Sequence, residues 1–314
     1  MNGHIVVVGS LNMDLVVHAP RHPRIGETLL GSDFCTYPGG KGANQAVAAA
    51  RLGGSVKMVG RVGSDGFGDV LLNTLVLDGV DSTYVRRDIH ESTGVALITV
   101  DSKGQNTIVV APGANGQVTP EDISTSEQAF IGASVLLVQL ECPMAAVHRA
   151  VEIGKSHEVC VILNPAPAQP LNAELLSKVD YLIPNQAELL LLTSLNGHDV
   201  AITCLHELGV PVVVVTLGAD GVLVSENGIK THIPALPTHV IDTTAAGDAF
   251  IGAFALAITR GCSTLEAAMW GNVAASVAVS RPGAQPSLPT WQELEAELKP
   301  YIEGLIQGNI RGKP

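Results

Sequence analysis

One segment of the sequence, IDTTAAGDAFIGAFALAI (241–258), places a carboxylate where an apolar helix should begin. Ala245, Ala246 and Gly247 precede Asp248 and have little or no side chain. The first N–H groups of a helix have no partner within it, and with the helix dipole they suit a phosphate or a developing oxyanion. Asp248 would then be close enough to remove a proton from a hydroxyl. The alternative is that Asp248 is a simple N-terminal charge.

A second candidate is the glycine-rich segment YPGGKGANQAVAAARLG (37–53). It is not a Walker A loop, because Lys41 is followed by glycine and no Ser or Thr is placed to hold a metal. We interpret its glycines as letting the backbone come close to a ligand, and Asn44 as a helix cap or a hydroxyl ligand. A plain Gly-Gly turn is the alternative.

Further polar residues follow runs typical of buried strands, and ligands of open α/β sheets bind beyond the carboxyl ends of strands. Asn12 and Asp14 in VGSLNMD can hydrogen-bond hydroxyls, or form an Asx-type turn. Asn185 and Glu188 in IPNQAE share one helix face. They can serve as ligands for a metal or its waters, or cap the helix.

Two loops carry weaker signals. VTLGADG (215–221) ends a strand-like run with a turn, where Thr216 and Gly218 can contact a nucleotide. SRPGAQPS (280–287) offers carbonyl groups and Ser287, which are cation ligands, although a plain loop explains it equally well.

The elements that position these residues follow from the apolar pattern. Helix-like segments, such as 43–53 with its Gly C-cap, separate short runs rich in branched residues. This alternation predicts an α/β fold, a doubly wound parallel sheet flanked by helices. The strand-like runs are 5–10, 135–140, 159–165, 181–185 and 212–218.

Two regions interrupt the alternation. Residues 14–40 contain prolines and no helical period, and residues 92–115 hold two strand-like runs around the hairpin signal DSKG. We expect a small β-sheet lid, inserted at about 14–38 and 92–112 into a single domain over 1–314.

Composition excludes several functions. The net charge is −12, and no basic cluster appears, so nucleic-acid binding is disfavoured. The five cysteines show no CxxC spacing, which disfavours a zinc site or disulfide framework and fits a reducing compartment.

The N-terminus lacks a basic leader and Asp14 interrupts its apolar patch, so we expect a soluble cytoplasmic protein without a membrane span. Residues 60–69 do not satisfy G-x-G-x-x-G and are interpreted as a loop before a helix, which argues against a dehydrogenase. No G-x-S-x-G nucleophile elbow is present, which disfavours an acyl-transfer hydrolase.

In order, the motifs GSLNMD, GGKGANQAVAAARLG, NPAPA, PNQAE, TLGADG, DTTAAGDAFIGAF and GAQPS resemble the ribokinase family of sugar kinases, the pfkB-type carbohydrate kinases, across residues 8–287. The resemblance implies transfer of the ATP γ-phosphoryl group to the terminal hydroxyl of a furanose, O5 for D-ribose. It also implies Mg²⁺, an activating K⁺ and a homodimer formed through the lid.

Carried over residue by residue, the resemblance makes Asp248 the general base and gives Ala245, Ala246 and Gly247 the amides that receive the phosphoryl group. The sugar would be held by Asn12, Asp14, Gly40, Lys41, Gly42, Ala43, Asn44 and Glu141. ATP would contact Asn185, Thr216, Leu217, Gly218, Ala219, Asp220, Gly221, Gly247, Asp248 and Asn272. Potassium would be bound by Asp242, Thr244, Ala278, Arg281, Gly283 and Ser287, and Glu188 would act indirectly on Mg²⁺ and phosphate.

Ala245 and Thr244 depart from the wider family, in which glycine is common at the position of Ala245. Two alternatives stay open: a kinase for 2-deoxyribose or another pentose or nucleoside, and a non-catalytic sugar-binding regulator on the same scaffold.

Overall fold

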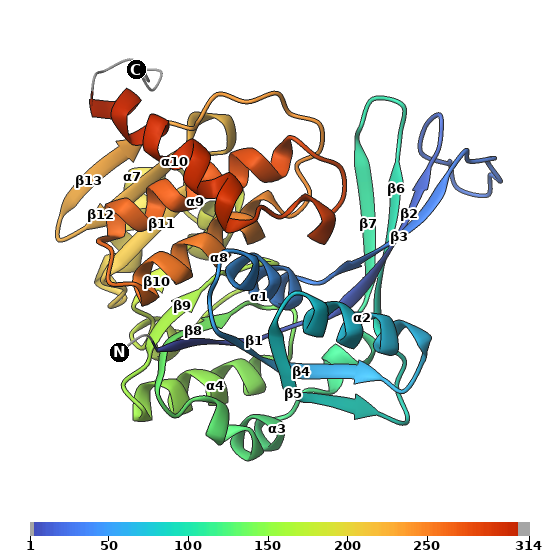
Figure 1. The fold of residues 1–314 in the computed structure, drawn as a ribbon, viewed down its shortest axis with the longest axis horizontal. Helices are drawn as coiled ribbons and strands as arrows, with labels where there is room; N and C mark the ends of the chain where they lie inside the picture. The colour runs from blue at the N-terminus through green and yellow to red at the C-terminus, as the bar shows by residue number, and fades with distance from the viewer. Residues whose placement is uncertain (1–2, 307–314) are drawn as a thin grey trace.

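The structure, a computed structural model, describes residues 3–306 and is built around a nine-stranded sheet (Figure 1). The strand order is β13-β12-β11-β10-β9-β8-β1-β4-β5. Neighbours are parallel from β11 to β5, whereas β12 and β13 pair antiparallel at one edge. The strands are β1 (His4–Val8), β4 (Val56–Gly63), β5 (Val80–Asp88), β8 (Ala133–Val138), β9 (Cys160–Leu163), β10 (Tyr181–Leu182), β11 (Val212–Thr216), β12 (Val222–Glu226) and β13 (Ile229–Ile233).

Two helical layers cover the sheet, because successive side chains of each buried strand point to opposite faces. Ile5 and Val7 of β1 belong to one core cluster, and Val6 and Val8 belong to the other. The first layer holds α1 (Lys41–Arg51), α2 (Gly66–Leu77), α8 (Ala246–Thr259), α9 (Thr264–Val279) and α10 (Trp291–Ile306). The second holds α3 (Pro120–Thr125), α4 (Met144–Ser156), α5 (Ala173–Leu176), α6 (Gln186–Thr193) and α7 (His198–Glu207).

A separate four-stranded sheet projects from this body (Figure 1). Its order is β3-β2-β6-β7, and it consists of β2 (Asn12–His18), β3 (Phe34–Gly39), β6 (Gly94–Val100) and β7 (Asn106–Ala111). The hairpin predicted at DSKG is confirmed, because β6 and β7 pair antiparallel on either side of it. We call this sheet the lid.

The predicted fold class is confirmed, with one difference in the main sheet. The five strand-like runs all contain strands, but the sheet is mixed because of the β12–β13 hairpin. Its Asn227-Gly228 turn, with both residues at positive φ, is a hairpin signal present in the sequence. The loop expected over 60–69 is also partly wrong, since β4 continues to Gly63 before α2 begins at Gly66.

The topology brings the candidate residues to one edge of the main sheet. β1 lies between β8 and β4 in the sheet. After β1 the chain passes through the lid strands β2 and β3 to α1. Parallel strands have their carboxyl ends at the same edge, where open α/β sheets bind ligands. The loops after β1, β8, β9, β10 and β11 therefore meet there. Within residues 3–306, none of the helices is long and apolar enough to span a bilayer.

Candidate active site

Helix α8 begins with a left-handed residue and leaves amides unpaired. Ala245 is the N-cap at φ 58° and ψ 9°, a conformation that a non-glycine residue rarely adopts. The N–H of Ala246 donates to the Thr243 carbonyl at 3.3 Å. Within residues 3–306, the N–H groups of Ala245, Gly247 and Asp248 have no acceptor. A Cβ built on Gly247 would meet no atom within 4 Å, so the helix start faces open space suited to an anion.

Asp248 is buried in the first turn of this helix and held at both oxygens. Its Oδ2 accepts a hydrogen bond from Asn44 Nδ2 at 2.9 Å, and its Oδ1 accepts one from Gln45 Nε2 at 3.0 Å. Burial raises the pKa of the Asp248 carboxyl, while the Lys41 charge and these two amides act in the opposite direction. A carboxylate with a raised pKa is a stronger base than one in water.

Asn44 has an unused acceptor at this point. Its Nδ2 is committed to Asp248, and its Oδ1 is buried without any partner in the described part of the chain. Buried polar atoms are nearly always hydrogen-bonded, so an orphan acceptor beside a carboxylate indicates a ligand that donates a hydroxyl. Asn44 Oδ1 is thus placed to accept a hydroxyl, one of the two roles considered for this residue from the sequence.

The glycines before α1 have a different role from the one predicted. Gly40 has φ 87°, and a Cβ there would lie 2.7 Å from the Asn12 nitrogen and 2.9 Å from the Ser10 carbonyl oxygen. A Cβ on Gly39 would overlap the Asp14 carboxylate. The missing side chains thus make room for the β1–β2 connection of the same chain rather than for a ligand. They bring Asn12 and Asp14 against the start of α1.

Three acidic groups, Asp14, Glu141 and Asp248, lie close to Lys41. Ser10 Oγ donates to the Glu141 carboxylate, which also accepts the Lys41 backbone N–H at 3.1 Å. Burial raises the pKa of Asp14 to about 7, with additional contributions from Glu141 and Asp248 and an opposing one from Lys41. Burial lowers the pKa of Lys41, but the surrounding carboxylates outweigh it, so the net direction is upward and the ammonium stays charged.

A cavity of about 210 Å³ adjoins Asp248, and residues from five sheet-edge segments line it. Asn185 and Glu188 lie there, yet they also form the capping box of α6. Asn185 Oδ1 accepts the Glu188 N–H and Glu188 Oε2 accepts the Asn185 N–H, each at 2.8 Å. Burial raises the pKa of Glu188. The lining residues are Lys41, Asn164, Ala166, Ile183, Asn185, Glu188, Thr216, Thr243, Ala245, Gly247, Asp248 and Ile251.

The expected nucleotide residues divide into two groups. Thr216 lines the cavity, and the turn after it, with Gly218, Ala219 and Asp220 exposed, continues outward from the same edge. Leu217 donates its N–H to the Gly221 carbonyl at 2.8 Å, which closes the turn. Asn272 is instead buried away from the cavity lining.

The Asn272 amide already has structural partners. Its Nδ2 lies 3.2 Å from the Pro234 carbonyl oxygen and 3.0 Å from the Tyr301 hydroxyl oxygen. It therefore ties the segment after β13 to α10.

The residues expected to bind potassium come together in two crossing segments. Asp242 Oδ2 accepts the Gly283 N–H at 2.8 Å, and Asp242 Oδ1 accepts the Thr244 N–H at 2.9 Å and its hydroxyl at 2.6 Å. Ser287 is buried and donates its hydroxyl to the Ala284 carbonyl. The Arg281 side chain forms an ion pair with Glu293 of α10.

The sequence interpretation assigned no role to two polar residues at the site. Asn164 follows β9 and lines the cavity, and its place at the carboxyl end of a strand was the available signal. Gln45 is fully buried yet reaches Asp248. The sequence around Gln45, including Asn44, did not indicate this contact. Within residues 3–306, no cluster of three or more His, Cys, Asp or Glu side chains could hold a metal ion.

Comparisons with known proteins agree with this geometry. Residues 2–291 match a family described as pfkB family carbohydrate kinase. A ribokinase of Haemophilus influenzae is 42% identical over 298 residues, 93% of this chain and 97% of that protein. A deoxyribokinase of Salmonella typhi is 37% identical over 301 residues, 94% of this chain and 98% of that protein. The structure of Arabidopsis thaliana ribokinase complexed with ribose and ATP has a TM-score of 0.89 and 36% identity, covering 95% of this chain and 99% of that one.

Proposed function

The chain belongs to the pfkB family of carbohydrate kinases, and we propose that it transfers the γ-phosphoryl group of ATP to the terminal hydroxyl, O5, of D-ribose. The observation that carries the proposal is the start of α8. There a buried carboxylate with a raised pKa lies at the wall of a cavity that Lys41 also lines, beside backbone amides that have no acceptor within residues 3–306. The ribokinase relatives, similar over nearly their full length, support ribose as the acceptor.

In the mechanism that we propose, the sugar lies between the lid and α1. Asn12, Asp14, Asn44 and Glu141 bind its hydroxyls, and the orphan Oδ1 of Asn44 accepts one of them. Asp248 removes the proton from the attacking hydroxyl, which assists a weak nucleophile by roughly 10²–10⁴-fold. The amides of Ala245, Gly247 and Asp248 stabilise the charge that develops on the transferred group. The ammonium of Lys41 adds to this stabilisation.

ATP is proposed to bind along the outer edge of the cavity. Thr216 and the turn to Gly221 would contact its sugar and phosphates, and Asn185 and Glu188 would lie beside the phosphates. Mg²⁺ supplies charge neutralisation to those phosphates when bound. Since the described residues offer no carboxylate cluster, we infer that Glu188 would act on Mg²⁺ indirectly, through water.

We propose that K⁺ binds where the segments 242–244 and 278–287 cross. The hydrogen bond from Gly283 to Asp242 joins these segments immediately before the α8 amides. A cation bound there would fix the loop that contains Ala245. Comparing turnover in potassium and sodium buffers tests this assignment, and identical rates contradict it.

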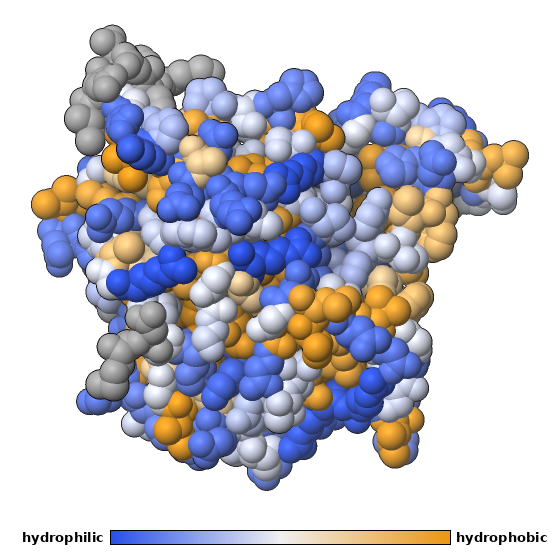
Figure 2. Space-filling model, in the orientation of Figure 1, coloured by the Kyte–Doolittle hydropathy of each residue, from blue (hydrophilic) through white to orange (hydrophobic). Residues whose placement is uncertain are grey.

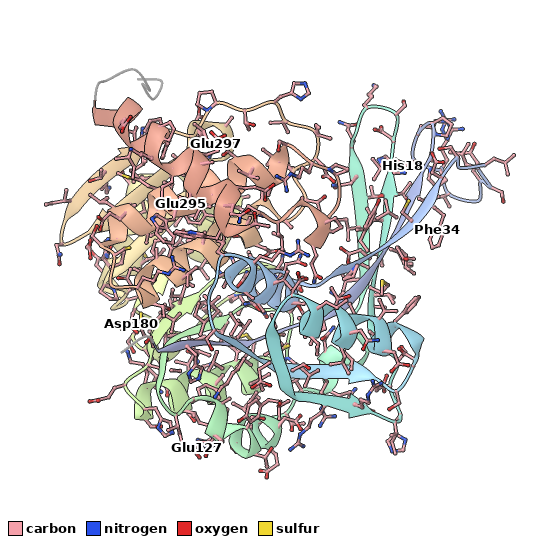
Figure 3. All side chains as sticks on the ribbon, in the orientation of Figure 1. His18, Phe34, Glu127, Asp180, Glu295 and Glu297 are labelled. Carbon is pink, nitrogen blue, oxygen red and sulfur yellow. The ribbon has the colours of Figure 1, made fainter. Side chains whose placement is uncertain are left out.

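A homodimer formed through the lid is also proposed. Asp14, Ala96 and Val110 are directly paired across three strands and so share one face, and Ile108 continues it toward the tip of the lid. Ile108 and Val110 are 52% and 45% exposed. Apolar surface gathers on the projecting lid in Figure 2. Phe34, labelled in Figure 3, pairs with Val17 and is 65% exposed on the opposite face of the lid. A second copy of the lid would cover the face that carries Ile108 and Val110.

A cytoplasmic location is proposed from the thiols. Cys35, Cys142, Cys160, Cys204 and Cys262 are all unpaired in the structure, which suits a reducing compartment.

A pentose panel with ATP tests the substrate. We expect the highest kcat/KM for D-ribose, and a higher value for 2-deoxyribose would favour the second candidate, which the deoxyribokinase relative supports.

The Asp248→Asn variant tests the general base. We expect ribose binding to persist while kcat falls by roughly 10²–10⁴-fold, and near-normal turnover would refute the role. Turnover on any sugar excludes a purely regulatory sugar-binding protein.

A further inference from the structure

The helix that contains the sugar-binding Asn44 also contains Gln45, a fully buried amide with no access to the cavity. Gln45 Nε2 donates to Asp248 Oδ1 at 3.0 Å and to Asn164 Oδ1 at 3.3 Å. Gln45 Oε1 accepts a hydrogen bond from Gln139 Nε2 at 2.6 Å. Every one of these contacts is to protein, so Gln45 has no free atom to present to a substrate.

These partners allow only one orientation of the Gln45 amide. Asn164 Nδ2 donates to the Ile183 carbonyl at 3.0 Å, and therefore Asn164 must present its oxygen to Gln45. Gln139 presents its NH₂ group to the Gln45 oxygen. A reversed Gln45 would set its own oxygen against the oxygens of Asp248 and Asn164. Such unpaired buried acceptors are strongly disfavoured.

The packing around Gln139 maintains this arrangement. Gln139 follows β8, and its side-chain oxygen lies against Gly9, where a Cβ would overlap it. The absence of a side chain at Gly9 therefore gives Gln139 the room to extend toward Gln45. Gly9 follows β1, so two neighbouring strands of the sheet determine where the Gln139 amide lies.

We propose that Gln45, oriented by Gln139 and Asn164, is a positioning residue for the phosphoryl transfer, because it fixes the rotation of the Asp248 carboxylate toward the attacking hydroxyl. The inference rests on the proposed role of Asp248 as general base. Asn44 donates to Asp248 Oδ2, and its own Oδ1 is proposed to accept a sugar hydroxyl, whereas Gln45 donates to Asp248 Oδ1 from a fully buried position outside the cavity lining. One oxygen is thus anchored while the other side of the carboxylate meets the substrate.

Removing the Gln45 amide has a predicted signature. The Gln45→Met variant keeps the chain length and loses the N–H donor to Asp248. A hydrogen bond to a charged group implies a fall in kcat of roughly 10- to 100-fold. The KM values for ribose and ATP should change by less than about 3-fold, because Gln45 touches neither substrate.

The pH profile supplies a second readout. Loss of an N–H donor raises the pKa of the Asp248 carboxyl, so the acid limb of kcat should move to higher pH. The charged groups that face Asp248 are Lys41 from α1, Glu141 after β8, Glu188 from α6 and Asp14 from β2. Measuring kcat at saturating ribose keeps the sugar over Asp14 during the titration.

A double-mutant cycle separates this arrangement from general destabilisation. Gln139→Met leaves the Gln45 donor in place and removes only the hydrogen bond to the Gln45 oxygen, so we expect a smaller loss of kcat, roughly 3- to 10-fold. The double variant should match Gln45→Met within about 2-fold, since Gln139 acts only through Gln45. Multiplicative losses would overturn the proposal. Ser126→Ala removes a buried hydroxyl that donates to the Asp122 carbonyl. It controls for destabilisation and should leave kcat and the pH limb unchanged.

The two hypotheses fail in different ways. If Asp248→Asn retains turnover, the general base is wrong. If Asp248→Asn is inactive but Gln45→Met keeps both kcat and its pH limb, only the positioning role is wrong. Should Gln45→Met not fold, as judged by circular dichroism and ribose calorimetry, Gln139→Met decides the matter, and an unchanged kcat in that variant overturns the proposal.

Discussion

Replacing Asp14 with asparagine should stabilise the sugar-free protein increasingly as pH rises. Asp14 is 8% exposed, and burial, with the nearby Glu141 and Asp248, raises its pKa from 3.8 to about 7. A group whose folded-state pKa is raised contributes stability below its unfolded pKa, and that contribution is lost as pH rises through the folded pKa. The wild type should therefore lose more stability over this window than Asp14→Asn, which keeps only the contributions of the other buried carboxyls.

The magnitude follows from the two pKa values. One pKa unit corresponds to about 1.36 kcal/mol. Between about pH 5 and about pH 8 the unfolded carboxyl is ionised throughout, while the folded one loses its proton only near pH 7. The loss over this range is roughly 3 kcal/mol. For a chain of this length, that corresponds to a change in Tm of roughly 4–5 °C.

Thermal unfolding without sugar, followed by circular dichroism at several pH values, measures this effect. The relevant quantity is the difference in Tm between Asp14→Asn and wild type. Any pH-independent effect of the substitution cancels when this difference is compared between pH values. The matched control is Asp88→Asn. The backbone N–H groups of His90 and Glu91 lower the pKa of Asp88, so its difference from wild type should stay constant above about pH 5. A Tm difference between Asp14→Asn and wild type that is the same at about pH 5 and about pH 8, or that shrinks as pH rises, would refute the reasoning.

Three further predictions follow from the backbone, the loops and the lid. Ala245→Gly should raise the free energy of unfolding by roughly 1 kcal/mol, because φ 58° costs nothing for glycine, and an unchanged urea midpoint would contradict this. Asp242→Ala should abolish any difference in turnover between potassium and sodium buffers, since it removes the acceptor that joins the two loops; a retained difference would count against the site. Ile108→Asp should shift the proposed dimer toward monomer in sedimentation velocity, with Ile229→Asp, exposed on β13, as the control, and an unaltered dimer would place the interface elsewhere.

The main elements could be predicted because their signals are local. Runs of branched residues ended by Gly, Ser or Asn gave five strands of the central sheet, and the helix from Lys41 to Arg51 followed from its apolar spacing and terminal glycine. β4 and β5 were not predicted, because exposed and charged side chains such as Arg86 and Arg87 break their apolar pattern. The β12–β13 hairpin carried its own signal in Asn227-Gly228.

The site could be predicted as a set of residue types but not as a set of contacts. Asp248 and the small residues before it indicated a base beside free amides, and the structure leaves the amides of Ala245, Gly247 and Asp248 unpaired but uses that of Ala246 within the turn. The glycines before α1 were expected to let the backbone approach a ligand, yet the atoms that a Cβ there would meet belong to residues 10–14 of the same chain. Which atoms crowd a glycine depends on how distant segments cross.

By itself, the sequence determined the chemical groups, the order of the elements and the family, since these depend on residue type and on spacing within a few turns of chain. Only the tertiary structure decided which partner each polar group has. Gln45 and Asp248 are 203 positions apart, and their hydrogen bond exists because α1 and α8 pack on the same face of the sheet. The raised pKa of Asp14 likewise arises from burial beside two other carboxylates. Hydrogen bonding and desolvation act over a few ångströms, and packing alone sets which residues come that close.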